Sequence, residues 1–181
     1  MKRPDKDDLV VSGSDVPVMT SLFNDVKGEV LGLSHESKIY RLSCADGRIT
    51  CELKGSVSSL LKKEEVNSVC IDREGRLWLN TTLGRILRSD ETMHKFENVS
   101  LDNEIDDCTV LGLLSDKNSV WIITNKKVLQ YNIDSQTFQH YSTADDNIMV
   151  DVFRYKAISL DGWGAVSYTH LRAHETLRHL V

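Results

Sequence analysis

Histidine and glutamate residues gather near the C-terminal end of this sequence in a pattern close to that of a metal site. The segment "AVSYTHLRAHETLRHLV" contains His170 and His174, four residues apart, followed by Glu175 and His179. A zinc-protease helix has the order His-Glu-x-x-His, which turns both rings toward one metal ion. Here the run from His174 to His179 is one residue too long, so the two rings face different ways. We therefore predict no metal site.

Aspartates recur at positions where they could act as acids, bases or calcium ligands. Each of three aspartates precedes a glycine by three residues: Asp25 and Gly28, Asp72 and Gly75, Asp161 and Gly164. Aspartate accepts hydrogen bonds from the backbone two residues on, and glycine tolerates positive φ, so this spacing indicates a tight turn. A glycosidase needs two carboxylates roughly 5 to 10 Å apart. One carboxylate per turn supplies no such pair, so we predict no catalytic residue.

Three residues near the C-terminal end could contact a sugar. Arg154, Tyr155 and Trp163 combine polar and aromatic groups that suit sugar hydroxyls and ring faces. The same residue types also pack at sheet edges and in cores. We keep these three as candidate ligand-binding residues, and we predict no cofactor.

The segments that position these residues form a repeat with a period of 43 to 47 residues. The clearest copy is "VNSVCIDREGRLWLNTTLGRILRSDETMHKFENV", an apolar stretch ending in Asp-x-x-Gly, then Leu-Trp-Leu, a turn and an alternating stretch. A later copy repeats Trp78 and Thr81 as Trp121 and Thr124, with Ser115 at the aspartate position. Tryptophan in the same register of each copy is typical of packing between sheets.

The repeat predicts an all-β fold. Each copy contains short segments rich in Val, Ile, Leu, Tyr and Thr, bounded by turn signals such as Asp46-Gly47. Four short strands repeated every 40 to 50 residues are typical of a β-propeller blade. We therefore predict a partial β-propeller, an open arc of about three and a half blades. A generic β-sandwich is the alternative, but it does not explain why the turn, tryptophan and threonine recur together.

The same alignment divides the chain into segments. We expect a partial strand or lead-in over 1–17, blade 1 over 18–65, blade 2 over 66–108, blade 3 over 109–151, the start of a truncated blade 4 over 152–164, and a separate tail over 165–181.

Composition excludes several partners. The 181 residues carry a net charge of −5, with acids and bases interleaved, which argues against a nucleic-acid-binding face. No apolar run approaches the ~20 residues of a membrane-spanning helix. The N-terminal segment lacks the apolar stretch of a signal peptide.

The stretch "VNSVCIDREGRLWLNTTLGRILRSD" resembles the two-component-regulator propeller repeat. The copy at Thr109 departs from that pattern by having Ser115 and Asn118 where aspartate and glycine are usual, and the first copy has Leu31 for tryptophan. The resemblance covers about Val18 to Gly164.

This resemblance implies the periplasmic sensor region of a hybrid two-component system. Such a region binds glycan-derived oligosaccharides, signals to a histidine kinase and performs no catalysis itself. Its implied partners are the remaining blades of a longer parent chain, and the parent would be dimeric. A protein-interaction scaffold, or a piece of a propeller-fold carbohydrate-active enzyme, is the alternative.

The segment from Ala165 to Val181 breaks the repeat directly after Gly164. Its string "SYTHLRAHET" resembles a translated sequencing-adapter read-through, so we expect a non-native tail whose spacing would also allow a helix. Its histidines are therefore left out of any functional site.

An arc of three and a half blades leaves sheet faces and edges uncovered. We predict that the monomeric chain is marginally stable or prone to aggregate, which thermal unfolding with light scattering would measure. A sharp, cooperative melt of monomeric chain would contradict this expectation.

Overall fold

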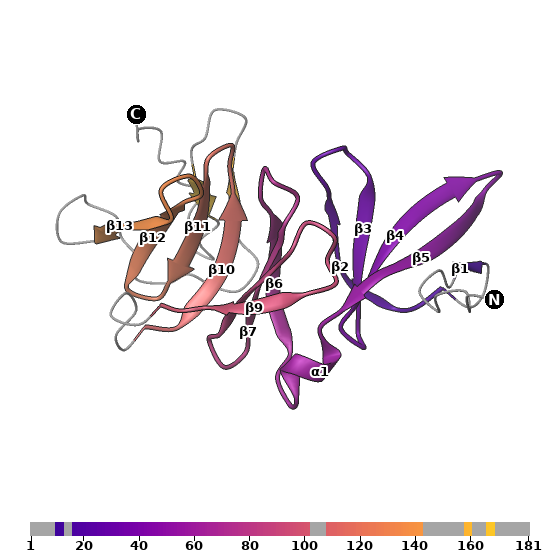
Figure 1. Cartoon of the computed structure of the whole chain (residues 1–181), viewed down its shortest axis with the longest axis horizontal. Coiled ribbons are helices and arrows are strands. Elements are labelled where there is room, and N and C mark those ends of the chain that lie inside the picture. The colour runs from indigo at the N-terminus through magenta and orange to yellow at the C-terminus, as the bar shows by residue number, and fades with distance from the viewer. Residues whose placement is uncertain (1–9, 13–15, 102–107, 143–157, 161–165, 169–181) are drawn as a thin grey trace, which may run out of the picture.

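The structure is a computed structural model that describes residues 10–12, 16–101, 108–142, 158–160 and 166–168. In these parts of the chain the strands form antiparallel sheets that lie side by side in an open arc (Figure 1). The predicted all-β, partial open β-propeller is confirmed.

The sheets follow one another along the chain. Sheet 1 contains β1 (Val10–Ser12), β2 (Met19–Asn24), β3 (Val30–Ser34), β4 (Lys38–Ala45) and β5 (Arg48–Ser56). Sheet 2 contains β6 (Val66–Ile71), β7 (Leu77–Thr81), β8 (Ile86–Ser89) and β9 (Phe96–Val99). Sheet 3 contains β10 (Val110–Ser115), β11 (Ser119–Thr124), β12 (Lys127–Asn132) and β13 (Thr137–Ser142). Sheet 4 contains β14 (Ile158–Leu160) and β15 (Val166–Tyr168).

In sheets 2 and 3 the four strands pair in the order in which they occur along the chain. Sheet 1 has the same order from β2 to β5, and β1 adds a fifth strand beside β5. Asp46 and Gly47 connect β4 to β5 with φ of 51° and 71°, as a two-residue hairpin turn requires. The strands β2, β6 and β10 each begin with a register shift, at Met19/Ser21, Val66/Ser68 and Val110/Gly112 respectively. A bulge of this kind increases strand twist, and its recurrence shows that the three units are built alike.

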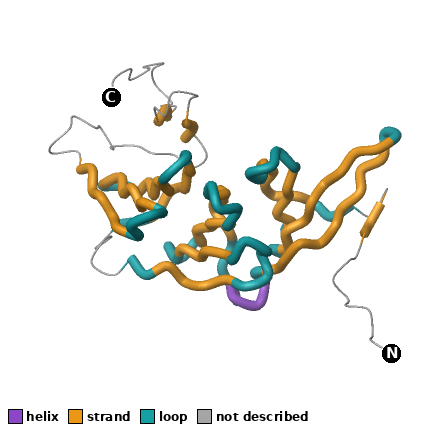
Figure 2. Tube along the Cα trace, turned by 45° about the horizontal axis from the view of Figure 1, so that its top comes forward, coloured by secondary structure: helices purple, strands orange, loops and turns teal. Residues whose placement is uncertain are grey.

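The strands β2, β6, β10 and β14 neighbour one another across the sheets and form the inner edge of the arc. One short helix, α1 (Ser58–Leu61), lies in the connection from sheet 1 to sheet 2. Figure 2 shows this helix in purple on the lower side of the arc, near its middle. Because α1 leads into the start of β6, the turn that follows β6 lies on the opposite side of the arc. The β2–β3 and β10–β11 turns lie on that same side.

The hydrophobic core lies between the sheets. Strand β7 is buried along its whole length, because its alternate side chains face two different neighbours. Leu77 and Leu79 join a cluster with Leu31, Leu33 and other residues of sheet 1. Trp78, which points the other way, joins a second cluster with residues of sheet 3. Sheet 2 is thus packed on both faces.

The C-terminal segment differs in part from the expectation. Val166–Tyr168 forms a strand rather than a helix, with Ile158 opposite Tyr168 and Leu160 opposite Val166. The unpaired edge of β14 offers hydrogen-bonding groups to an extended segment, and Val and Tyr favour strands. The remainder of the tail, 165 and 169–181, lies outside the described residues.

The backbone of β5 lies in close contact with the turn between β8 and β9 at Gly55. A Cβ at this position would lie 2.0 Å from the carbonyl oxygen of Met93 and 3.0 Å from its carbonyl carbon. Met93 is buried and has a φ of 61°, so this backbone is held in a left-handed conformation inside the interface. Only glycine at position 55 permits this contact.

We predict that Gly55→Ala destabilises the protein by roughly 1–3 kcal/mol, because the new methyl group must push Met93 out of the interface. Urea unfolding followed by tryptophan fluorescence measures the change. Arg48→Ala, at an exposed position on the same strand, is the control and should change stability by less than about 0.5 kcal/mol. Equal stability of the two variants would contradict the close contact.

Candidate functional site

The turn after β6 is organised by the carboxylate of Asp72, which is fully buried. Its Oδ1 accepts hydrogen bonds from the backbone N–H groups of Glu74 and Arg76, both at 3.0 Å. Its Oδ2 accepts from Nε of Arg76 and from Nε1 of Trp78, both at 2.8 Å. Gly75 closes the turn with a φ of 79°. Asp72 therefore shapes the turn and also fixes the indole that packs against sheet 3.

The corresponding residue in sheet 3 is Asp116, not Ser115. Asp116 Oδ1 accepts from the backbone N–H groups of Asn118 and Ser119 at 2.8 Å, and Oδ2 accepts from Trp121 Nε1 at 2.7 Å. Ser115 instead donates its hydroxyl to the carbonyl of Ile71 in sheet 2, at 2.6 Å. The turn is one residue shorter than in sheet 2, so alignment on Trp121 placed the aspartate one position too early.

Sheet 1 retains the turn but has no indole to anchor. Asp25 Oδ1 accepts from the N–H groups of Lys27 and Glu29 at 2.8 Å, and Gly28 has a φ of 80°. Leu31 occupies the tryptophan position, so no ring N–H reaches this carboxylate.

The predicted tryptophans pack against other aromatic rings, and the predicted threonines form hydrogen bonds within turns. Trp78 is fully buried between sheets, with its ring 5.1 Å from that of Tyr131 on β12. Trp121 is half-buried and lies 5.6 Å from the ring of Tyr141 in its own sheet. The two threonines form the next turn: Thr81 Oγ1 accepts from the N–H of Arg85, and Thr124 Oγ1 from that of Lys127.

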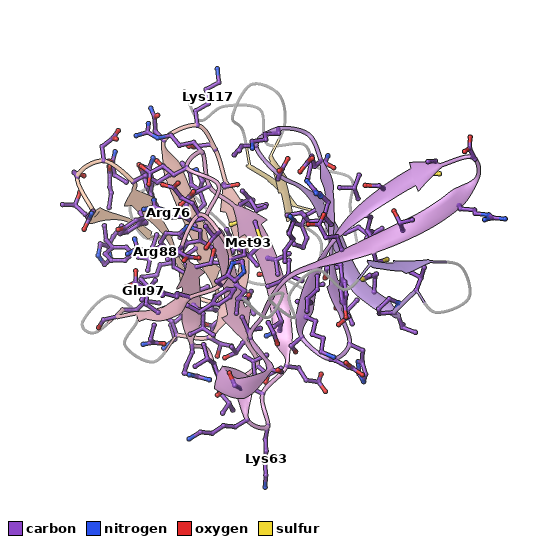
Figure 3. The ribbon with its side chains drawn as sticks, turned by 45° about the vertical axis from the view of Figure 1, so that its right-hand side comes forward. Lys63, Arg76, Arg88, Met93, Glu97 and Lys117 are labelled. Atoms are coloured by element: carbon purple, nitrogen blue, oxygen red, sulfur yellow. The ribbon has the colours of Figure 1, made fainter. Side chains whose placement is uncertain are left out.

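A recess of about 430 Å³ lies where the turns of three consecutive sheets converge. It is lined by Asn24, Asp25, Val26, Ile71, Asp72, Arg73, Asp116 and Lys117. In each sheet these residues sit at the end of the inner strand and at the start of the turn that follows. Figure 3 shows Lys117 at the end of the molecule opposite Lys63, which follows α1. The recess therefore opens on the face of the arc away from the helix.

Some polar groups of the recess already have hydrogen-bond partners within the protein, and others are available to a ligand. Asp72 and Asp116 already use both oxygens within the protein. The guanidinium of Arg73 donates to Asn118 Oδ1 at 2.6 Å and to Asp134, which links sheet 2 to sheet 3. Within the described part of the chain, the side chains of Asn24 and Lys117 form no hydrogen bond or ion pair. Hydroxyl groups of a ligand could bind these groups.

Catalytic groups are not assembled here. Both Asp72 and Asp116 are held in acceptor roles, and burial raises the pKa of the Cys70 thiol to about 12, far from the range of a reactive thiolate. Among the described residues, no three His, Cys, Asp or Glu side chains form a group that could hold a metal ion. In that same part of the chain, no helix is long and apolar enough to cross a membrane.

The candidate ligand-binding residues Arg154, Tyr155 and Trp163 lie outside the described residues, as do Asp161 and Gly164. The recess was missed by sequence reasoning because its lining comes from three copies of the repeat. One signal was available: the residue after each turn aspartate is variable, namely Val26, Arg73 and Lys117.

Comparison with known proteins supports the fold. No family model and no curated protein matches the chain. The extracellular domain of the hybrid two-component system BT3049 from B. thetaiotaomicron matches with a TM-score of 0.55 and 16% identity, over 82% of this chain and 20% of that one.

Two other solved structures share the architecture. A catalytically inactive virginiamycin B lyase from Staphylococcus aureus has a TM-score of 0.54 and 16% identity, over 89% of this chain and 52% of that one. YCF48 bound to D1 peptide has a TM-score of 0.50 and 22% identity, over 75% of this chain and 42% of that one. The chain thus spans between a fifth and about half of these proteins, and it shares their β-propeller fold.

We predict a graded loss of stability when the turn aspartates are replaced by alanine. Asp72→Ala should cost roughly 3–5 kcal/mol, because it removes the acceptor of Arg76 Nε and of the buried Trp78 N–H, although Arg76 keeps its ion pair with Glu74. Asp116→Ala should cost about 1–3 kcal/mol and Asp25→Ala about 1 kcal/mol, since they lose fewer and more exposed bonds. Denaturant unfolding of the three variants measures the order, and equal losses would contradict the anchoring role.

Proposed function

We propose that this chain is a segment of a periplasmic sensor propeller that binds a glycan-derived oligosaccharide in the recess formed by the three turns. The segment itself performs no catalysis. Further blades of a longer parent chain are its partners, and the bound sugar signals through them to a histidine kinase.

The observation that carries this proposal is the convergence of equivalent turns from three sheets on one recess. The recess combines one amide, three carboxylates and two cations beside apolar Val26 and Ile71. Ligand sites commonly have such a mixture of apolar walls and a few convergent polar groups. Sugar hydroxyls both donate and accept hydrogen bonds, so groups of both kinds can be used.

The fold comparison favours a sensor among the functions that propellers perform. The extracellular domain of a hybrid two-component system shares this architecture over most of the chain. The structure of YCF48 bound to D1 peptide supports a second candidate function, a protein-interaction scaffold.

We predict that one of a panel of neutral xylo-, manno-, arabino- and gluco-oligosaccharides binds the purified chain with measurable heat in titration calorimetry. Lys117→Ala and Asn24→Ala should each weaken binding roughly 10-fold, the effect of about 1.4 kcal/mol from a lost hydrogen bond to the sugar. Chromatography of the sugar after incubation checks for turnover.

Lys63→Ala is the matched control, because Lys63 is exposed at the opposite end of the molecule. Its affinity should equal that of the parent. Cleavage of the sugar would overturn the non-catalytic assignment, and binding of peptides without binding of any sugar would favour the scaffold.

A further inference from the structure

Sheets 2 and 3 are joined by hydrogen bonds between their inner strands. Ser68 Oγ on β6 accepts from the N–H of Leu113 on β10 at 3.0 Å. Ser115 Oγ on β10 donates to the carbonyl of Ile71 on β6 at 2.6 Å. Hydrogen bonds are short and directional, so two of them between the same strands fix how these strands lie against each other.

The turns and the outer strands of sheets 2 and 3 are joined as well. Arg73, in the turn after β6, donates to Asn118 in the turn after β10 and to Asp134 in the turn after β12. Farther from the inner edge, Arg88 on β8 donates to the hydroxyl of Tyr131 on β12 at 3.3 Å. Polar contacts at three places therefore hold sheets 2 and 3 together as one unit.

Sheet 1 is attached to sheet 2 in a different way. Among the residues that the structure describes, no hydrogen bond or ion pair joins sheet 1 and its turns to sheet 2 and its turns. The interface is the apolar cluster around Leu31 and Leu79. At the recess the two turns meet by van der Waals contact, since a Cβ on Gly75 would lie 3.8 Å from Cγ2 of Val26. Apolar contacts are not directional, so they allow small changes of tilt between the sheets.

Beside α1, in contrast, sheet 1 is anchored to sheet 2. Gly55, the second-last residue of β5, packs directly against the backbone of Met93. In the connection that follows, Arg85 of sheet 2 donates to Glu64 Oε1 at 2.6 Å and to the carbonyl of Leu60 in α1 at 2.9 Å. The anchor lies on the side of the arc away from the recess, so sheet 1 is fixed at one end and held only by apolar contacts at the other.

We propose that sheet 1 tilts as a unit about its α1 end and thereby opens and closes the recess. The recess then has a fixed wall, with Arg73 and Lys117 from sheets 2 and 3, and an adaptive wall, the turn from Asn24 to Val26 in sheet 1. Hinged closure of one element over a ligand, about a short connecting segment, is a common form of conformational change in proteins.

A ligand can bridge the two walls, because each wall carries a polar side chain that is available to it. Within the described part of the chain, Asn24 on the adaptive wall and Lys117 on the fixed wall form no hydrogen bond or ion pair. A ligand shifts an equilibrium toward the state that it binds more tightly, so an occupied recess favours the closed position. This inference rests on the proposed function and adds to it how the bound sugar changes the position of sheet 1.

Distances between spin labels on the three sheets, measured by double electron–electron resonance on the full chain, test the hinge. The labels are attached through Lys27→Cys in sheet 1, Lys95→Cys in sheet 2 and Gln139→Cys in sheet 3, all at exposed positions. Cys44→Ser and Cys108→Ser remove the exposed and the half-buried native thiols. Circular dichroism establishes that the labelled chains are folded like the parent.

Without any ligand, we expect the distance distribution of the 27/139 pair to be at least about twice as broad as that of the 95/139 pair, because only the first pair spans the hinge. A control pair inside sheet 1, Lys27→Cys with His35→Cys, should be as narrow as the 95/139 pair. A narrow control shows that sheet 1 moves as a unit and that the label at position 27 is itself ordered.

Removing the polar contacts of the fixed wall should make sheet 3 mobile too. Arg73→Ala combined with Ser115→Ala should broaden the 95/139 distribution, because the bonds to Asn118, Asp134 and Ile71 are lost. Arg48→Ala, exposed on the β4–β5 hairpin, is the matched control and should leave both distributions unchanged.

The panel of neutral xylo-, manno-, arabino- and gluco-oligosaccharides is then the probe for closure. A sugar that binds in calorimetry should narrow the 27/139 distribution and leave the 95/139 distribution as it was. Equal widths of the two pairs without ligand, or a bound sugar that leaves the 27/139 distribution unchanged, would overturn the hinge while the sugar site stands. If no sugar binds, the proposed function fails, and the widths without ligand still decide whether sheet 1 tilts.

Discussion

The structure depends on one constraint: the strands carry apolar side chains on both faces, so each sheet needs a sheet on either side. Strand β7 shows this most directly, because Leu77 and Leu79 pack toward sheet 1 while Trp78 packs toward sheet 3. A single four-stranded sheet of this kind cannot bury both faces alone. Stacking around an axis is the arrangement that satisfies the requirement, and it brings β2, β6, β10 and β14 together at the inner edge.

The candidate site follows from the same stacking. Because the inner strands lie side by side, the turns that follow them converge at one end of the arc, and their variable positions line a common recess. The aspartate that makes each turn also holds the tryptophan between sheets, through 2.8 Å and 2.7 Å bonds to the indole N–H in sheets 2 and 3. Packing between sheets and the geometry of the recess are therefore coupled through Asp72 and Asp116.

Sheet 1 departs from the other units, and its departures occur together. Leucine replaces tryptophan at position 31, glycine replaces a bulky residue at position 32, and the long β4–β5 hairpin extends from the arc (Figure 1). The face of that hairpin on the side of sheet 2 carries an ion-pair network in which Arg41 contacts Glu29 and Glu52, and Lys54 contacts Glu52. The opposite face of sheet 1 carries Leu22 and Val30, which are 64% and 41% exposed.

The sequence by itself determined the fold class, because turn signals and alternating apolar residues are local and recur at a fixed period. It also identified Asp25 and Asp72 as turn residues, since an aspartate three positions before glycine has a local function. In the third sheet it put Ser115 at the aspartate position and missed Asp116, because a turn shortened by one residue keeps its hydrogen bonds but loses its spacing. Only the tertiary structure decided which side chains meet: Arg73 with Asp134, Trp78 with Tyr131, and Gly55 with Met93 are 38 or more residues apart and join different sheets. Contacts between sheets depend on how the sheets stack, and no local pattern encodes the pairing of side chains across them.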